Sequence, residues 1–157
     1  KEVSERDQFL AKEMEDLASL QNIHFLGWRE YSTIPCYLKA FDVCLIPFKV
    51  NQQTNTMNPY TLYEYVAAGK PVVATDLFEI KRFDQRYPGI IYIADSHEEF
   101  YKKVKMALSE DGEKLLPLRL QAARENTWEI RLEDMSRIIY ERLEAKERSQ
   151  GSGVRDC

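Results

Sequence analysis

Residues 46–73 read IPFKVNQQTNTMNPYTLYEYVAAGKPVV, and they give the clearest indication of the fold class. It opens on the end of an apolar run and continues into a polar loop of about ten residues, which is longer than packing alone requires. A short helix is predicted next, ending before Gly69, and a second apolar run starts at Pro71. A strand, a helix and a second strand in this order are typical of a parallel α/β sheet.

Apolar residues outside this stretch extend the same pattern. Four short runs lack the alternation of a half-solvated strand and predict strands buried on both faces: residues 23–26, 43–46, 71–74 and 90–93. Helical spacing predicts amphipathic helices around Leu10, Met14 and Leu17; Ile34, Leu38 and Phe41; Leu62 and Val66; Phe100, Val104 and Leu108; Leu116, Leu120 and Ala123; and Trp128, Leu132, Met135 and Ile139. We therefore expect an α/β fold, a Rossmann-like doubly wound parallel sheet with extra C-terminal helices, whose ligands bind beyond the carboxyl ends of the strands.

Length and charge narrow the class of protein. The 157 residues predict one domain over residues 1–148 and a flexible tail over residues 149–157. A net charge of −4 argues against a nucleic-acid partner, because binding to phosphates needs a basic surface. No apolar run is long enough to span a membrane. The three cysteines (Cys36, Cys44, Cys157) are an odd number without paired spacing, which favours a reducing cytoplasm.

Most of the usual catalytic motifs are missing from the sequence. It contains neither a glycine-rich phosphate loop nor a G-x-S-x-G turn. His24 and His97 have no metal-ligand spacing, so we expect no metal. Asp76 and Glu79 follow a predicted strand, where they are ligands or, more commonly, helix caps. Cys36 and Cys44 lie in apolar segments and are predicted to be core residues.

The start of the helix near residue 60 is the best candidate site. Asn58 suits the N-cap and Pro59 the first helical position, so the N–H groups of Tyr60, Thr61 and Leu62 are expected to point outward at the carboxyl edge of the sheet. Such a helix start attracts phosphate. Glu64 lies one turn further on and can accept two hydroxyl hydrogen bonds, as from a ribose. The alternative is that Glu64 satisfies buried backbone or a tyrosine hydroxyl.

The same segment resembles the donor-binding segment of retaining GT-B glycosyltransferases, specifically glycosyltransferase family 4. The phrase is N-P-x-x-L-Y-E-Y-x-A-A-G-K-P-V-V over residues 58–73. Three flanking stretches resemble family motifs in the same order: residues 22–28, 40–47 and 126–131. The resemblance covers about residues 20–143 and implies that the chain is the C-terminal, donor-binding half of a GT-B fold.

Position by position, the resemblance implies a nucleotide-diphosphate-sugar site. Glu64 would bind the ribose, Gly27 and Trp28 would border the base, and the diphosphate or sugar would contact Met57, Asn58, Pro59, Tyr60, Thr61 and Leu62. Trp28 with Arg29 is equally suited to packing between domains. Lys49 is either a charge for the phosphates or a solvated loop lysine.

Two positions depart from the family pattern. Thr56 stands at the first position of the E-x7-E motif, where relatives have the sugar-contacting glutamate. Thr61 stands where related sequences often carry a lysine. Both substitutions remove charged groups that would contact the donor.

The resemblance further implies the reaction and its partners. We expect the donor-binding portion of a metal-independent hexosyltransferase that retains configuration by front-face displacement, with a glycan or lipid acceptor bound by an N-terminal domain. The chain is expected to lack its first strands and the Arg/Lys diphosphate clamp, and therefore to be inactive alone. Cell-envelope polysaccharide biosynthesis, a cytoplasmic location and peripheral membrane association of the whole protein complete the expectation. The alternatives are a non-catalytic interaction or assembly module and, less favoured, a GT-B sugar-nucleotide epimerase.

Overall fold

The computed structural model describes the backbone of residues 5–151 and the side chains of residues 11–148. Residues 1–34 and 35–157 form two compact units, and each is described by itself. The first unit contains α1 (Glu5–Ala18) and the 3-10 turn η1 (Tyr31–Thr33). The second begins in α2 (Ile34–Ala40), which starts at the boundary between the units, and contains the rest of the fold.

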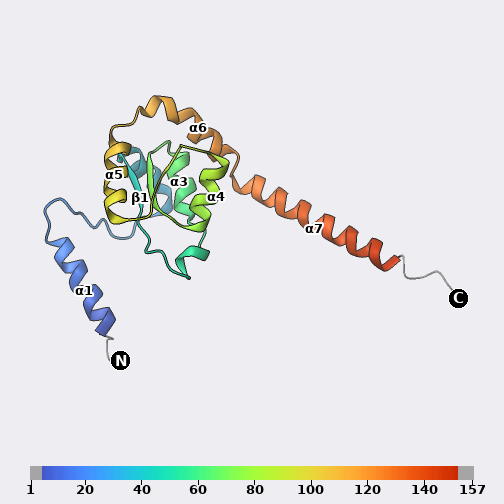
Figure 1. Ribbon diagram of the computed structural model, residues 1–157, viewed down its shortest axis with the longest axis horizontal. Coiled ribbons are helices and arrows are strands. Elements are labelled where there is room, and N and C mark those ends of the chain that lie inside the picture. Colours follow the sequence, from blue (N-terminus) through green and yellow to red (C-terminus); the bar gives the residue numbers. More distant parts are fainter. Residues whose placement is uncertain (1–4, 152–157) are drawn as a thin grey trace. The chain divides into compact units, whose positions relative to one another are not determined.

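The second unit is built on a parallel sheet of three described strands in the order β1-β2-β3 (Figure 1). Its elements follow the chain as β1 (Cys44–Ile46), η2 (Thr54–Thr56), α3 (Tyr60–Ala67), β2 (Val72–Thr75), α4 (Phe78–Arg86), β3 (Tyr92–Ala94), α5 (His97–Leu108), α6 (Gly112–Arg124) and α7 (Trp128–Gly151). Cys44 pairs with Val72 across β1 and β2, and Val73 pairs with Tyr92 across β2 and β3. The predicted α/β fold with a parallel sheet, flanking helices and extra C-terminal helices is confirmed.

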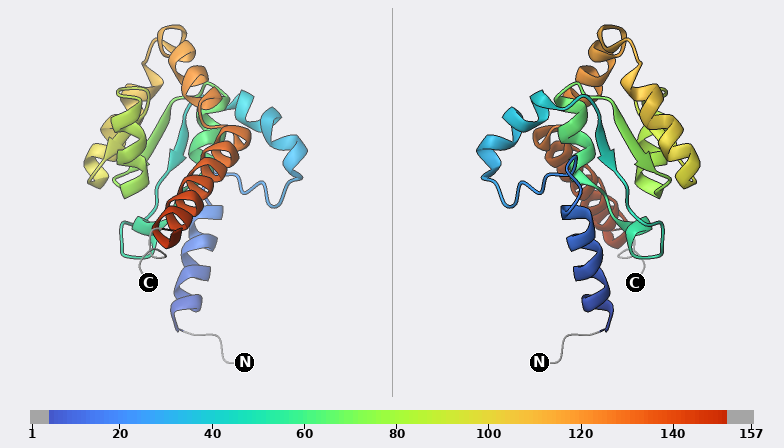
Figure 2. Two further views of the ribbon diagram at one scale, coloured as in Figure 1. Left: turned by 90° about the vertical axis from the view of Figure 1, so that its right-hand side faces the viewer. Right: turned by 90° about the vertical axis from the view of Figure 1, so that its left-hand side faces the viewer.

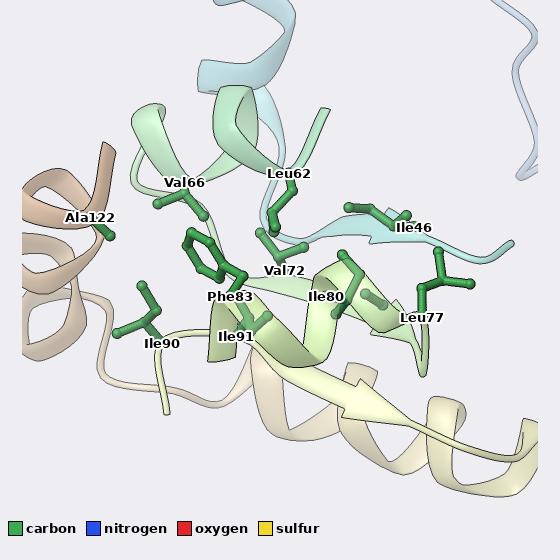
Figure 3. Packing of buried hydrophobic residues seen from close by; sticks show 11 residues of the cluster. Ile46, Leu62, Val66, Val72, Leu77, Ile80, Phe83, Ile90, Ile91 and Ala122 are labelled. Atoms are coloured by element: carbon green, nitrogen blue, oxygen red, sulfur yellow. The ribbon is translucent and has the colours of Figure 1, made fainter. Parts of the chain in front are cut away.

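The core lies on the face of the sheet that α3, α4 and α6 cover (Figure 3). Alternate residues of a strand point to opposite faces, so Val72 and Ala74 belong to this cluster while Val73 is buried on the face toward α5. All three have no exposed surface, which explains why the sequence of β2 is continuously apolar. Leu62, Val66 and Phe83 supply the helical side of the cluster.

A buried ion pair fastens α6 to the sheet. The Arg119 side chain is fully buried and the Glu110 side chain is 6% exposed. Arg119 Nη2 donates to Glu110 Oε2 at 2.8 Å, and Arg119 Nε donates to the Ile90 carbonyl at 2.9 Å. The Tyr92 hydroxyl donates to the same Glu110 oxygen at 2.9 Å. Because every charged atom has a partner, the pair can stay buried beside β3.

The last helix contacts the domain through its first residues. Trp128 lies 5.7 Å from the Tyr60 ring, and the Arg131 guanidinium lies 4.3 Å above the Tyr63 ring. Figures 1 and 2 show that α7 continues from these residues as one long helix. Its later apolar side chains, such as Met135 and Ile138, are more than half exposed. No helix in the described part of the chain is long and apolar enough to cross a membrane.

The described residues cover only part of the predicted flexible tail, residues 149–157. Helix α7 continues to Gly151, so residues 149–151 of the expected flexible segment are helical in the backbone. Residues 152–157, with Cys157, lie outside the described residues.

The expected strand over residues 23–26 is wrong. This run is not part of any strand, and Phe25 and Leu26 are 53% and 46% exposed. An apolar run becomes a strand only where a neighbouring strand supplies the ladder hydrogen bonds, and residues 23–26 pair with none. The predicted burial failed together with the strand, because local apolarity carries no information about the neighbouring strand.

The expectation for Cys36 is also wrong. Cys36 is exposed, whereas Cys44 is buried as predicted. Helix α2 buries one residue, Leu38, and a seven-residue helix leaves most of its surface outside the core.

Candidate functional site

The polar loop that follows β1 is ordered by its own side chains. The Asn51 amide donates to Thr54 Oγ1, and the Thr54 amide donates to Asn51 Oδ1, each at 3.0 Å. The Thr54 hydroxyl donates in turn to the Lys49 carbonyl at 2.5 Å. This reciprocal pair folds the loop into the turn η2, beyond the carboxyl end of β1 (Figure 2).

Asn55 ties this loop to α4. Its Oδ1 accepts a 2.8 Å hydrogen bond from the Phe78 amide, the first helical N–H of α4. The N-cap residue of α4, Leu77, makes no side-chain cap bond, so Asn55 performs that function from 23 residues earlier in the chain. The expectation that Asp76 and Glu79 are caps is wrong: Asp76 pairs with Lys81 at 3.1 Å, and Glu79 pairs with Arg82 at 3.6 Å.

The start of α3 differs from the expectation by one residue. Pro59, with extended φ and ψ of −73° and 101°, is the N-cap, and Asn58 lies before it and makes no cap bond. The Leu62 amide donates to the Pro59 carbonyl at 3.0 Å, so it is not free. The prediction failed for Asn58 because the helix starts one residue later than the usual Pro position implies. It failed for Leu62 because the first turn closes with an i→i−3 hydrogen bond to Pro59.

Two amides at this helix start have no partner in the described chain. No described residue accepts a hydrogen bond from the N–H of Tyr60 or of Thr61. The two residues are exposed, and α3 follows β1 and precedes β2 in a parallel unit, so its N-terminus lies at the carboxyl edge of the sheet. Free N–H groups there can bind an anion.

Glu64 lies one turn into α3 and is half-buried. Its carboxylate forms no hydrogen bond or ion pair with any of the described side chains or backbone groups. The alternative, in which Glu64 satisfies buried backbone or a tyrosine hydroxyl, therefore has no contact in its support. Burial raises the pKa of the neighbouring Tyr65, and the charges of Cys44 and Glu64 raise it further.

The other residues predicted for the donor site are divided between the two units. Met57 is 40% exposed and Tyr60 is 59% exposed, with its ring against Trp128. The Thr56 hydroxyl donates to the Gln53 carbonyl at 2.8 Å. Gly27, with φ of +69°, and Trp28, 82% exposed, belong to the unit of residues 1–34.

Asn58 has an unusual environment for a polar side chain. Its Oδ1 is buried and accepts no hydrogen bond from any described group. The residue lines a cavity of about 230 Å³ that it shares with Tyr63 of α3 and Arg131 of α7. This cavity lies on the side of α3 where α7 begins.

A larger open cavity lies at the carboxyl ends of the strands. It measures about 1020 Å³ and is lined by residues that follow β1 and β3, with Thr75 at the end of β2. Lys49 and Asp95 are among its charged residues. The sequence predicts ligand-binding segments after residues 26, 46, 74 and 93. Residues near the last three line this cavity, Lys49 among them, whereas the run that ends at residue 26 forms no strand and does not line the cavity.

Two features of the structure, one in the loop of the site and one outside the site, were not predicted from the sequence. Asn55 received no role, although Asn and Thr at positions 51, 54 and 55 are typical of self-bonded turns. Arg119 and Glu110 were also missed, since each resembles an ordinary surface charge of a helical region. Their burial depends on β3, which the local sequence does not reveal.

The comparisons with known proteins give one family and one relative. The profile of the family described as "Glycosyl transferases group 1" matches residues 3–110. The putative teichuronic acid biosynthesis glycosyltransferase TuaH of Bacillus subtilis (strain 168) is 26% identical over 115 residues, which are 73% of this chain. The aligned part spans 29% of the length of TuaH. No solved structure matches the chain.

Proposed function

The chain belongs to the glycosyl transferases group 1 family, and from this premise we propose that the start of α3 binds the donor, a nucleotide-diphosphate sugar. The observation that carries the proposal is the pair of unpartnered amides, Tyr60 and Thr61, with the unpaired carboxylate of Glu64 one turn behind them. The amides suit the diphosphate, and the carboxylate suits the two ribose hydroxyls.

The neighbouring residues are assigned by the same chemistry. Lys49 adds positive charge at the edge of the sheet, and residues 57–59 form the wall of the diphosphate site. Thr56 offers a hydroxyl where a glutamate would contact the sugar, so its contact with the sugar is weaker. These assignments rest on the residue types and on the position of the loop beyond β1.

For the whole protein we propose a retaining, metal-independent hexosyltransferase of the cytoplasm. Its acceptor is a glycan or lipid bound by an N-terminal domain, and its product belongs to cell-envelope polysaccharide, as the name of TuaH suggests for that relative. Residues 1–148 then form the donor-binding domain, and the whole enzyme associates peripherally with the membrane where its acceptor is anchored. Transfer requires the acceptor to be positioned against the donor, so the chain alone is expected to be inactive.

One observation favours a second candidate, a non-catalytic assembly module. The Thr56 hydroxyl donates to the Gln53 carbonyl within its own loop, so it is engaged structurally at the place where the sugar-contacting carboxylate is missing. A module of this kind retains the fold and has lost the affinity for the donor.

Nucleotide titration separates the two candidates. The chain is titrated with UDP, GDP and ADP, and its thermal stability is followed. Binding at about 100 times Kd adds roughly 2.7 kcal/mol to the free energy of unfolding. The absence of any shift at millimolar concentrations of all three nucleotides favours the assembly module.

The role of Glu64 is tested in the same titration. Glu64→Ala is expected to weaken binding of the best nucleoside diphosphate by roughly tenfold, the loss of hydrogen bonds to a charged group, and to leave pyrophosphate binding unchanged. Glu133→Ala, at an exposed glutamate of α7, is the matched control and should bind like the parent chain. Equal nucleotide affinity in Glu64→Ala would remove the ribose assignment.

A further inference from the structure

Two parallel helices of this unit start at the same edge of the sheet with different surroundings. Helix α4 begins at Phe78, whose amide is already bonded to Asn55 Oδ1 at 2.8 Å. Helix α3 begins at Tyr60, and no described group accepts from the amides of Tyr60 and Thr61. The start of α4 is therefore closed by the protein itself, and the start of α3 is open to a ligand.

The group that closes α4 comes from the loop leading into α3. Asn55 lies in η2, and η2 packs on the start of α4 (Figure 1). Three residues separate Asn55 from Pro59, the N-cap of α3. The Met57 amide donates to the Thr54 carbonyl at 3.1 Å. This hydrogen bond joins the residues on either side of Asn55 and Thr56, so the backbone that leads from Asn55 toward α3 is constrained.

We propose that Asn55 is a positioning residue for the donor. By anchoring η2 to the first turn of α4, its side chain fixes the backbone of residues 56–59 and so holds the diphosphate-binding start of α3 in its binding geometry. The proposal rests on the proposed donor site and adds to it a residue that need not touch the ligand. A loop anchored in the free protein loses less conformational entropy when the diphosphate binds, which increases affinity.

The variant Asn55→Ala removes the acceptor and leaves the rest of the loop unchanged. Hydrogen exchange measured by NMR should show lower protection of the Phe78 amide, whose only described acceptor is Asn55. Affinity for the best of UDP, GDP and ADP should fall by roughly fivefold, the worth of one ordinary hydrogen bond in anchoring the loop. Asn55→Asp keeps an oxygen acceptor and should restore the protection of the Phe78 amide.

Gln52→Ala is the matched control, because Gln52 is an exposed residue of the same loop whose side chain is not used by the loop's hydrogen bonds. It should change neither the exchange of Phe78 nor the affinity. A general loss of stability in Asn55→Ala would lower its melting temperature and the protection of amides throughout the core. It would not single out the Phe78 amide.

The remaining outcomes separate this inference from the proposed function. If the parent chain binds a nucleoside diphosphate and Asn55→Ala binds it equally, Asn55 positions nothing and the inference is overturned while the donor site stands. If affinity falls with the Phe78 amide still protected, Asn55 contacts the ligand directly, and the positioning role is again overturned. If the parent chain binds none of the three nucleotides at millimolar concentration, the donor site fails and the inference fails with it.

Discussion

At the scale of single residues, Gly69 meets two requirements at the end of α3. Its φ is +73°, a conformation that side chains disfavour, and a Cβ at this position would overlap Leu116 Cδ1 of α6. Gly89 has a similar φ of +77° and no atom within 4 Å of the corresponding Cβ. A comparison of substitutions at the two glycines therefore distinguishes the cost of backbone strain, which both share, from the cost of steric overlap, which only Gly69 has.

Gly69→Ala should destabilise the chain more than Gly89→Ala does. The left-handed backbone costs each variant about 1–2 kcal/mol, and the overlap with Leu116 adds roughly 1–2 kcal/mol for Gly69→Ala. Denaturant unfolding measures both variants. The double variant Gly69→Ala/Leu116→Ala should show a favourable coupling, since it removes the overlap; an equal loss in the two single variants would mean that Leu116 moves aside at no cost.

The site residues show how far a single sequence predicts function. The short helix over Tyr60–Ala67 and the place of Glu64 within it follow from helical spacing and from the stop at Gly69. The N-cap did not follow, because Asn58 has a suitable capping side chain, whereas the course of the loop makes Pro59, which has no capping side chain, the residue before the helix. The role of each residue toward a donor stays a prediction, carried by the family and by the unpartnered groups.

At the scale of elements, one buried ion pair joins α6 to β3 and to the turn after α3. Arg119 reaches Glu110 and the Ile90 carbonyl, and its Nη1 lies 3.5 Å from the Gly69 carbonyl. A charge in such a place is costly when its partner is removed.

Arg119→Met should therefore lower the free energy of unfolding by about 3–5 kcal/mol, because Glu110 is left buried without its counter-charge. Adding Glu110→Gln should recover part of this loss. Arg148→Ala breaks an exposed pair of α7, with side chains 74% and 67% exposed, and should change stability by less than about 1 kcal/mol. Chemical denaturation of the three variants gives the comparison, and a small effect in Arg119→Met would indicate that water enters the site.

Prediction of the elements succeeded where the signal was local. The three strands of the sheet lie within one or two residues of their predicted runs, and the helix predicted around Phe100, Val104 and Leu108 is α5. The run at residues 23–26 has the same apolar character but no neighbouring strand, so it did not form one. A strand requires a partner that the local sequence does not specify.

At the scale of the whole molecule, the buried thiol of Cys44 links stability to alkaline pH. Burial raises the pKa of Cys44 from the ordinary value of 9.0 to about 11, and the charge of Lys70 opposes that rise. A raised pKa in the folded state means that the unfolded chain loses its proton first. The stabilisation is thus complete below pH 9 and is lost as the pH rises toward 11.

Over this interval the parent chain should lose roughly 2–3 kcal/mol of stability through Cys44. Cys44→Ala should be less stable than the parent at pH 7, because it leaves a small cavity, and its stability should decline less between pH 9 and 11. Urea unfolding at stepped pH measures the two slopes. Parallel slopes would show that the Cys44 thiol does not control the decline. Tyr87 and Tyr92, whose pKa values burial also raises, contribute equally to both chains, whereas in Cys44→Ala the pKa of Tyr65 loses the part of its rise that comes from the Cys44 charge.

The exposed apolar side chains of α7 have a consequence for cooperativity. Its first residues are held by Tyr60 and Tyr63, but Met135, Ile138 and Leu143 are 58%, 54% and 52% exposed, so little tertiary packing within the unit supports the later turns. A helix without such packing depends on its own propensity and on local pairs such as Asp134–Arg137. The distal turns of α7 can then melt independently of the core, so a two-state transition describes the sheet domain, and helix content measured over the whole chain reports two separate equilibria.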